Sequence, residues 1–329
     1  METLSGVKCI NRKLICIILI IIYCSIAVSG CGKSKIDLDY KEINTITSTN
    51  KVDNKAKTFA SNLAVINTDY EGTVGMQVEA ESSAGLFDLN SKEVLYAKAI
   101  HSKMAPASLT KIMTAYVALR HSNKDDIITC SQNVDKMDYD ATRCGLQPGD
   151  TLTMNQALHA LLINSANDAG VAIAEHISGS VEAFSDLMNQ EALSLGATNT
   201  HFVNPHGLTD ADHYTSAYDL YLITRAAMAY NDFNEIISMT DYETVYKDAN
   251  GAEKAMSFKT TNLFLRGDYS APGNVTVIGG KTGTTSAAGN CLILIVKDTA
   301  GNPYIGVIMK ASERALVNEE MAQLLSEIK

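Results

Sequence analysis

The chain has 329 residues, of which 46% are hydrophobic and 19% are charged, and its mean hydropathy is close to zero. This composition is typical of a folded globular protein and excludes a wholly disordered chain. The formal net charge of −10 argues against nucleic acid as a partner, because phosphate binding needs a basic surface. Only one stretch, near the N-terminus, is apolar enough to enter a bilayer, which excludes a multi-pass transporter.

The N-terminus has the pattern of an export signal. Basic residues precede an apolar run over 14–28, which has the length of a signal-peptide core and is shorter than a membrane-spanning helix. The run ends in Val-Ser-Gly-Cys31, which resembles a bacterial lipobox, where the cysteine thiol becomes lipidated before cleavage. We therefore expect residues 1–30 to be a lipoprotein signal peptide and Cys31 to hold the protein on the extracytoplasmic face of a bacterial cell membrane. An uncleaved signal anchor is the alternative.

The rest of the chain is expected to be a short tether followed by one domain. Residues 31–57 are polar and lack an apolar period, as expected of a flexible tether, whereas no linker or repeat interrupts residues 58–329. The three cysteines that follow the tether are too few for a disulfide scaffold. Cys291 lies in an apolar run and is expected to be buried, whereas a disulfide between Cys130 and Cys144 is left open.

Strand-like segments lie at both ends of this domain, and helical segments lie between them. The first strands are predicted at 83–88 and 93–97, with a four-residue turn between them. Helical patterns follow at about 108–121, 153–163, 169–178, 181–195 and 217–230. The C-terminal part predicts strands at 275–278, 291–296 and 304–309 and a last helix at about 316–328.

Short connections between these strands favour antiparallel pairing. The order of the elements therefore predicts an α+β fold, in which strands from both chain ends form one antiparallel five-stranded sheet covered by helices. The middle of the chain is expected to form a helical lobe beside the sheet, with a cleft between the lobe and the sheet edge.

Ser108-Leu-Thr-Lys111 places a hydroxyl and an amine three residues apart on one helix face. The positive end of the helix dipole and burial both lower the pKa of such a lysine, so it can accept the serine proton. The pattern therefore suits a nucleophile and its base. By itself it is also compatible with an N-cap serine beside a solvated lysine, and Ser-x-x-Lys recurs in the signal and in the tether.

Two further motifs carry polar side chains that suit the same cleft. Ser165-Ala-Asn167 follows the end of a predicted helix, where a turn can direct both side chains into a cleft, and Asp168 is predicted to be the N-cap of the next helix. Lys281-Thr-Gly-Thr284 continues a predicted strand whose edge is expected to be open. A cation beside hydroxyls on a strand edge can bind a carboxylate, and the glycine permits close approach.

In this order, the three motifs resemble the serine D-Ala-D-Ala carboxypeptidases, the low-molecular-weight penicillin-binding proteins of peptidase family S11. The resemblance covers about residues 60 to 329. The segments that carry it are Pro-Ala-Ser-Leu-Thr-Lys-Ile-Met-Thr (106–114), Asn-Ser-Ala-Asn-Asp-Ala (164–169), Asn-Pro-His-Gly-Leu (204–208) and Gly-Gly-Lys-Thr-Gly-Thr (279–284). It implies a β-lactamase/transpeptidase-like fold. Many relatives also carry a second β-rich domain and a C-terminal anchor, which we do not expect here.

The resemblance also implies a mechanism and a set of partners. Ser108 would attack the terminal D-Ala-D-Ala bond of a peptidoglycan stem peptide, with Lys111 as the base and Ser165 as the proton relay. The backbone N–H groups of Ser108 and Thr284 would form the oxyanion hole. Substrate would be bound by Asn167, Lys281, Thr282, Gly283 and Thr284. β-Lactams would be trapped covalently on Ser108, and no cofactor or metal is expected.

Three alternatives remain open at this point. A class A β-lactamase shares the three motifs, but its deacylating Glu-x-x-Leu-Asn is absent from this chain. A lipoprotein sensor or binding module would become acylated without turnover. A metal hydrolase would need His201, His206 and His213, whose spacing fits no standard zinc pattern.

Overall fold

The computed structural model describes residues 60–76, 78–137 and 141–329. The chain divides into two units, Met1–Ala56 and Lys57–Lys329, and only the second contains described residues. The expected signal peptide, Cys31 and the whole of the expected tether (31–57) lie outside the described residues, so they stay predictions. Across the described ranges, none of the helices is both long and apolar enough to cross a bilayer.

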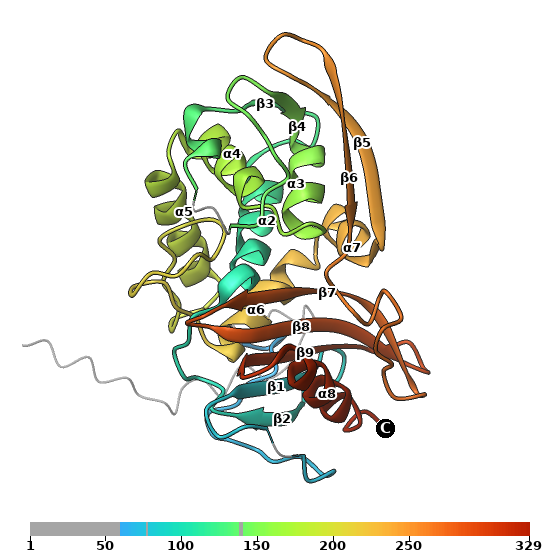
Figure 1. The fold of residues 1–329 in the computed structure, drawn as a ribbon. Helices are drawn as coiled ribbons and strands as arrows, with labels where there is room; N and C mark the ends of the chain where they lie inside the picture. The colour runs from blue at the N-terminus through green and yellow to red at the C-terminus, as the bar shows by residue number, and fades with distance from the viewer. Residues whose placement is uncertain (1–59, 77, 138–140) are drawn as a thin grey trace, which may run out of the picture. The chain divides into compact units, whose positions relative to one another are not determined.

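One antiparallel sheet joins the two ends of the second unit (Figure 1). Its strands lie in the order β2-β1-β9-β8-β7, and every neighbouring pair is antiparallel. The strands are β1 (Ser83–Asp88), β2 (Val94–Lys98), β7 (Val275–Thr285), β8 (Gly289–Asp298) and β9 (Pro303–Ala311). This confirms the predicted five-stranded sheet, although the last three strands are longer than predicted. β7 stands at the end of the strand order, so its Lys281–Thr284 segment lies on a sheet edge.

Alternating side chains of the sheet build two separate hydrophobic cores. On β8, Ile293 and Ile295 join the large core shared with the central helices, whereas Leu292 and Leu294 join a smaller core. The smaller core is completed by helix α8 (Arg314–Leu325), which packs on β8 and β9. Because both faces of the sheet are covered, the sequences of its central strands are continuous runs of apolar residues.

The helices between the two strand groups form the predicted lobe. They are α2 (Thr110–His121), α3 (Met154–Leu162), α4 (Asn167–Ser178), α5 (Val181–Ser194), α6 (Ala217–Ala227) and α7 (Asn231–Ser238). Thr153 and Gln156 make the predicted capping box of α3, and Ser216 caps α6. α7 was not predicted, although its buried Phe233, Ile236 and Ile237 have helical spacing.

A second sheet was also not predicted. It has the strand order β3-β4-β5-β6, with β3 (Ile127–Thr129), β4 (Thr151–Thr153), β5 (Asp241–Lys247) and β6 (Glu253–Lys259). β3 and β4 have three residues each, which is too short for an alternating pattern to stand out. β5 and β6 pair along their full length, from Asp241–Lys259 to Lys247–Glu253.

Candidate active site

Ser108 lies in a single 3₁₀ turn, η2 (Ala107–Leu109), that leads directly into α2. It is therefore not the N-cap of an α-helix, because the N-cap position of α2 is Leu109. Ala107 has a positive φ of 48°, a strained value for a residue with a side chain. The turn thus holds the hydroxyl one residue after a strained position.

Lys111 lies in the first turn of α2 and is fully buried, so the alternative of a solvated lysine is wrong. Its Nζ lies 2.8 Å from Ser108 Oγ, 2.7 Å from Asn167 Oδ1 and 2.7 Å from the carbonyl oxygen of His206. Burial lowers the pKa of Lys111 well below its ordinary value, and the charge of Lys281 lowers it further. A neutral Lys111 can donate to Asn167 and His206 while its lone pair faces the serine hydroxyl.

Ser165 and Lys281 form a second buried pair. Ser165 follows the end of α3 with a φ of 63°, and Lys281 on β7 is 1% exposed. Lys281 Nζ donates to Ser165 Oγ and to the carbonyl oxygen of Thr282, at 2.9 Å each. Burial lowers the pKa of Lys281 to about 7, so this amine can hold or release a proton near neutral pH.

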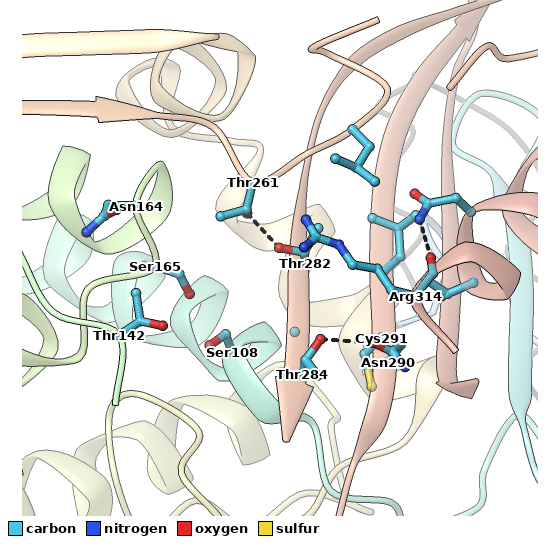
Figure 2. Close-up of a pocket in the computed structure, with 15 residues that line it drawn as sticks. Ser108, Thr142, Asn164, Ser165, Thr261, Thr282, Thr284, Asn290, Cys291 and Arg314 are labelled. Atoms are coloured by element: carbon cyan, nitrogen blue, oxygen red, sulfur yellow. Dashed lines mark hydrogen bonds between the residues drawn. The ribbon is translucent and has the colours of Figure 1, made fainter. Parts of the chain in front are cut away.

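A cleft runs past Ser108 and has two compartments that share Ser108, Thr142 and Thr284, and Figure 2 shows the first of them. The first, about 220 Å³, lies between Ser165 and the end of the sheet. Its other lining residues include Thr261, Thr282, Gly283, Asn290, Arg314 and Asn318. The second, about 310 Å³, is lined by Asn167, His206, Gly207, Leu208, Thr209, Thr285 and Ser286.

Gly283 lets β7 pass directly against η2, the turn that carries Ser108. A Cβ placed at Gly283 would lie 3.0 Å from Ser108 N and 3.0 Å from the carbonyl oxygen of Pro106. The threonines on either side are held by hydroxyl contacts, Thr282 with Thr261 at 2.6 Å and Thr284 with Asn290 at 3.2 Å. The sheet edge and the start of α2 therefore make one wall of the cleft.

Gly207 packs against η2 from the other side. Its φ is 89°, and an added Cβ would lie 1.8 Å from the carbonyl oxygen of Ala107. Gly207→Ala is therefore expected to destabilise the fold by about 3 kcal/mol and to slow acylation of Ser108 by penicillin. Gly179→Ala is the control, because its φ of 80° is similar but its Cβ would meet nothing within 4 Å. Equal melting temperatures for the two variants would contradict this packing.

Several cleft residues escaped the sequence analysis, among them Thr142, Asn290 and Arg314. Thr142 lies in a loop without a recognisable pattern, Asn290 follows a turn, and Arg314 begins α8 after the last strand. Arg314 adds an exposed cation to the first compartment, which Thr282 and Thr284 also line (Figure 2). No local spacing links these residues to the motifs, so only the tertiary structure reveals them.

The sequence analysis predicted Asp168 as the N-cap of α4, and this prediction was wrong. The N-cap position of α4 is Ala166, and Asp168 lies inside the first turn of this helix. Its buried carboxylate instead accepts hydrogen bonds from the 144–146 loop.

The disulfide that the sequence left open is not formed, because Cys130, Cys144 and Cys291 are all free thiols. Cys291 is buried in β8, as predicted.

The three histidines considered as metal ligands make hydrogen-bonding contacts with protein groups. His201 Nδ1 contacts the carbonyl oxygen of Asp212 at 2.7 Å, and His206 Nδ1 accepts from the Leu208 N–H at 3.3 Å. His213 Nδ1 accepts from the Val203 N–H, and its Nε2 lies 2.8 Å from the Thr110 hydroxyl. Within the part of the chain that the structure describes, no group of three potential metal ligands is present.

The buried His213 makes stability depend on pH. Burial lowers its pKa to about 4, whereas an unfolded histidine titrates near about 6.5. Between these values the unfolded chain binds a proton that the folded chain does not, so stability falls as the pH drops through this range. In His213→Gln the fall in melting temperature between about pH 6.5 and 4 should be shallower than in the parent protein. Equal slopes would contradict the assignment.

Comparison with known proteins places this fold and cleft in a family. The sequence model described as D-alanyl-D-alanine carboxypeptidase, peptidase S11, matches residues 67–313. The chain therefore belongs to the S11 family of serine peptidases, which have a β-lactamase-like α+β fold. This agrees with the resemblance seen in the three motifs.

Individual relatives give the same result. The chain is 35% identical over 275 residues to D-alanyl-D-alanine carboxypeptidase DacF of Bacillus subtilis, covering 82% of this chain and 66% of that protein. It is 31% identical over 249 residues to DacD of Escherichia coli, covering 73% and 61%. The crystal structure of the Streptomyces K15 DD-transpeptidase superposes with a TM-score of 0.68 at 27% identity, covering 74% of this chain and 95% of that one. The chain thus spans less than two thirds of the length of these two curated relatives.

Proposed function

We propose that this protein is a serine D-alanyl-D-alanine carboxypeptidase that removes the terminal D-Ala from peptidoglycan stem peptides. The observation that carries this proposal is the convergence of two buried lysines on two serine hydroxyls in one cleft. Lys111 contacts Ser108 and Lys281 contacts Ser165, although residues 111 and 281 lie far apart in the sequence. A neutral lysine beside a serine is the arrangement that activates a hydroxyl for acyl transfer.

Acylation follows from the position of Lys111. Its lone pair takes the proton of Ser108, and the oxygen forms a bond to the carbonyl carbon of the penultimate D-Ala. The bond to the terminal D-Ala nitrogen breaks, and the proton taken by Lys111 passes through the Ser165 hydroxyl to the leaving amine, which leaves Lys111 neutral again. The negative charge on the carbonyl oxygen is stabilised by the backbone N–H groups of Ser108 and Thr284, because β7 packs against η2 at Gly283.

Deacylation uses the same groups in the reverse order. Lys111 takes a proton from water, whose oxygen bonds to the acyl carbon, and the ester bond to Ser108 breaks. Ser108 recovers its proton, and the shortened peptide leaves with a carboxylate at its new end. Asn167, whose Oδ1 is 2.7 Å from Lys111 Nζ, both positions this base and lines the compartment that would hold the acyl side of the substrate.

The terminal carboxylate of the substrate would bind in the first compartment. Lys281 is buried and contacts Ser165, so we assign it mainly to the proton path and to the charge of the site. Arg314 is exposed and lines this compartment together with Thr282 and Thr284, and a guanidinium with two hydroxyls suits a carboxylate.

Arg314→Gln is expected to raise the KM for an acyl-L-Lys-D-Ala-D-Ala peptide about tenfold with little change in kcat. The reason is that the charge binds substrate and transition state alike. Lys297→Gln, which removes an exposed cation from β8 outside the cleft, serves as the control and should leave both constants unchanged. A fall in kcat at constant KM would contradict this role for Arg314.

Release of D-alanine tests the proposed activity. The described unit should release many equivalents of D-alanine from N-acyl-L-Lys-D-Ala-D-Ala, and benzylpenicillin should inhibit this release by acylating Ser108. At most one equivalent would identify a sensor or binding protein that is acylated without turnover. Rapid turnover of penicillin itself would identify a β-lactamase.

We further propose that the protein is a lipoprotein of the bacterial cell membrane, anchored through Cys31 at the extracytoplasmic face. The basic segment, the apolar run over 14–28 and the small residues before Cys31 support this. Cys31→Ser should abolish incorporation of labelled fatty acid, whereas Cys24→Ser inside the apolar run should not. Labelling of Cys31→Ser would contradict the proposal.

A further inference from the structure

Asp168 lies next to Asn167 at the start of α4 and has a completely buried carboxylate. The carboxylate accepts hydrogen bonds from three successive backbone N–H groups, those of Cys144 at 3.0 Å, Gly145 at 2.8 Å and Leu146 at 3.0 Å. It also accepts from the Cys144 thiol at 3.4 Å and the Ala169 N–H at 3.0 Å. Gly145 has a φ of 89°, which lets the consecutive N–H groups converge on one anion.

The loop held in this way is a wall of the cleft. Thr142, which lines both compartments, accepts a hydrogen bond through its carbonyl oxygen from Asn167 N at 2.8 Å. Asn164 contacts the carbonyl oxygen of Arg143 at 3.3 Å. The segment from Asn164 to Asp168 therefore holds the loop from Thr142 to Leu146 at several points, and Asp168 makes most of these contacts.

The Asp168 carboxylate also affects the protonation of Lys111. Lys111 is faced by Lys281 from β7, by Asp168 from α4, and by His206 and His213 from the segment before α6. Burial lowers the pKa of His206 to about 3 and that of His213 to about 4, so both are neutral where the enzyme works. The Cys130 and Cys144 thiols that face Asp168 stay protonated, because burial raises the pKa of each.

We propose that Asp168 is a positioning residue for acyl transfer, which fixes the 142–146 loop as a cleft wall and supplies a buried negative charge that opposes Lys111. This inference rests on the proposed function. Asp168 touches neither the nucleophile nor the space for substrate, so it acts through Lys111, Asn167 and the loop. Its charge favours the protonated form of Lys111, which sets the lowest pH at which the lysine is a base.

The rate of Ser108 acylation by benzylpenicillin, measured from about pH 5 to 10, tests both roles. The acidic limb of the profile is the range in which the rate rises as Lys111 loses its proton. In Asp168→Asn this limb should move to lower pH by roughly half to one unit, because the loss of the opposing charge lowers the pKa of Lys111. The plateau rate should fall about tenfold because the loop amides lose their acceptor. Asp168→Glu keeps the charge but not the geometry, so only its plateau should fall.

Two variants separate these effects from general damage. Gly145→Ala disturbs the convergence of the N–H groups and should lower the plateau without moving the limb. Asp150 is a buried carboxylate four residues beyond this loop that accepts from the Gln147 N–H, and the charges that shift the pKa of Lys111 are those of Lys281 and Asp168. Asp150→Asn should therefore leave the limb in place.

The outcomes are distinct. An acidic limb that coincides in Asp168→Asn and the parent protein, or that also moves in Asp150→Asn, overturns the charge role. Unchanged plateaus in Asp168→Glu and Gly145→Ala overturn the positioning role, and these variants decide it if Asp168→Asn does not fold. Absence of acylation in the parent protein would instead count against the proposed function.

Discussion

Replacing Lys111 with methionine is expected to slow penicillin acylation by about 10⁴-fold without unfolding the protein. The amine is fully buried and hydrogen-bonded to Ser108, so its removal leaves the nucleophile without a base. Methionine has a similar length and avoids the cost of burying an amine, so the melting temperature should not fall greatly. Stopped-flow measurement of acylation with a parallel thermal melt checks both statements.

Lys111→Arg distinguishes a base from a fixed positive charge. A guanidinium stays protonated, so it preserves the charge but cannot accept the serine proton. This variant should therefore be about as inactive as Lys111→Met. Substantial acylation of Lys111→Arg would show that the positive charge, and not proton transfer, is what Ser108 needs.

Lys281→Met is expected to lower kcat for peptide hydrolysis by about 10²-fold. The Ser165 hydroxyl loses the amine that lies 2.9 Å from it, which interrupts the path of the proton to the leaving group. The positive charge of Lys281 also lowers the pKa of Lys111, so its loss should move the acidic limb of the pH profile to higher pH. Kinetics as a function of pH measure both effects.

The relation between KM and kcat decides what Lys281 does. A rise in KM with an unchanged kcat and an unchanged acidic limb would show that Lys281 binds the substrate carboxylate directly. The expected result is the opposite pattern, because its Nζ contacts Ser165 and a backbone carbonyl within the buried site.

The five-stranded sheet and the motif positions could be predicted because both depend on local signals. The runs at Ser83–Asp88 and Cys291–Val296 are apolar and are bounded by turn residues. Thr153 and Gln156 carry a capping pattern that acts within one turn. The three motifs could be combined because their residue types make up one acyl-transfer set.

The parts that were missed depend on tertiary contacts. β3 and β4 are three-residue strands that are recognisable only from their pairing. Asp168 was assigned to a local cap, because the loop amides that it binds lie 22 to 24 residues away in the sequence. Arg314 reaches the cleft because α8 begins beside the end of the sheet, and no motif encodes that placement.

The most direct test of the account is the covalent state of Ser108 after exposure to benzylpenicillin. Intact mass measurement followed by peptide mapping should find one penicilloyl group, on the peptide that contains Ser108, and none on the Ser108→Ala variant. Ser286→Ala, which removes another hydroxyl from the same cleft, should be labelled like the parent protein. An unmodified parent protein, or an adduct on a different residue, would contradict the central claim that Ser108 is the nucleophile.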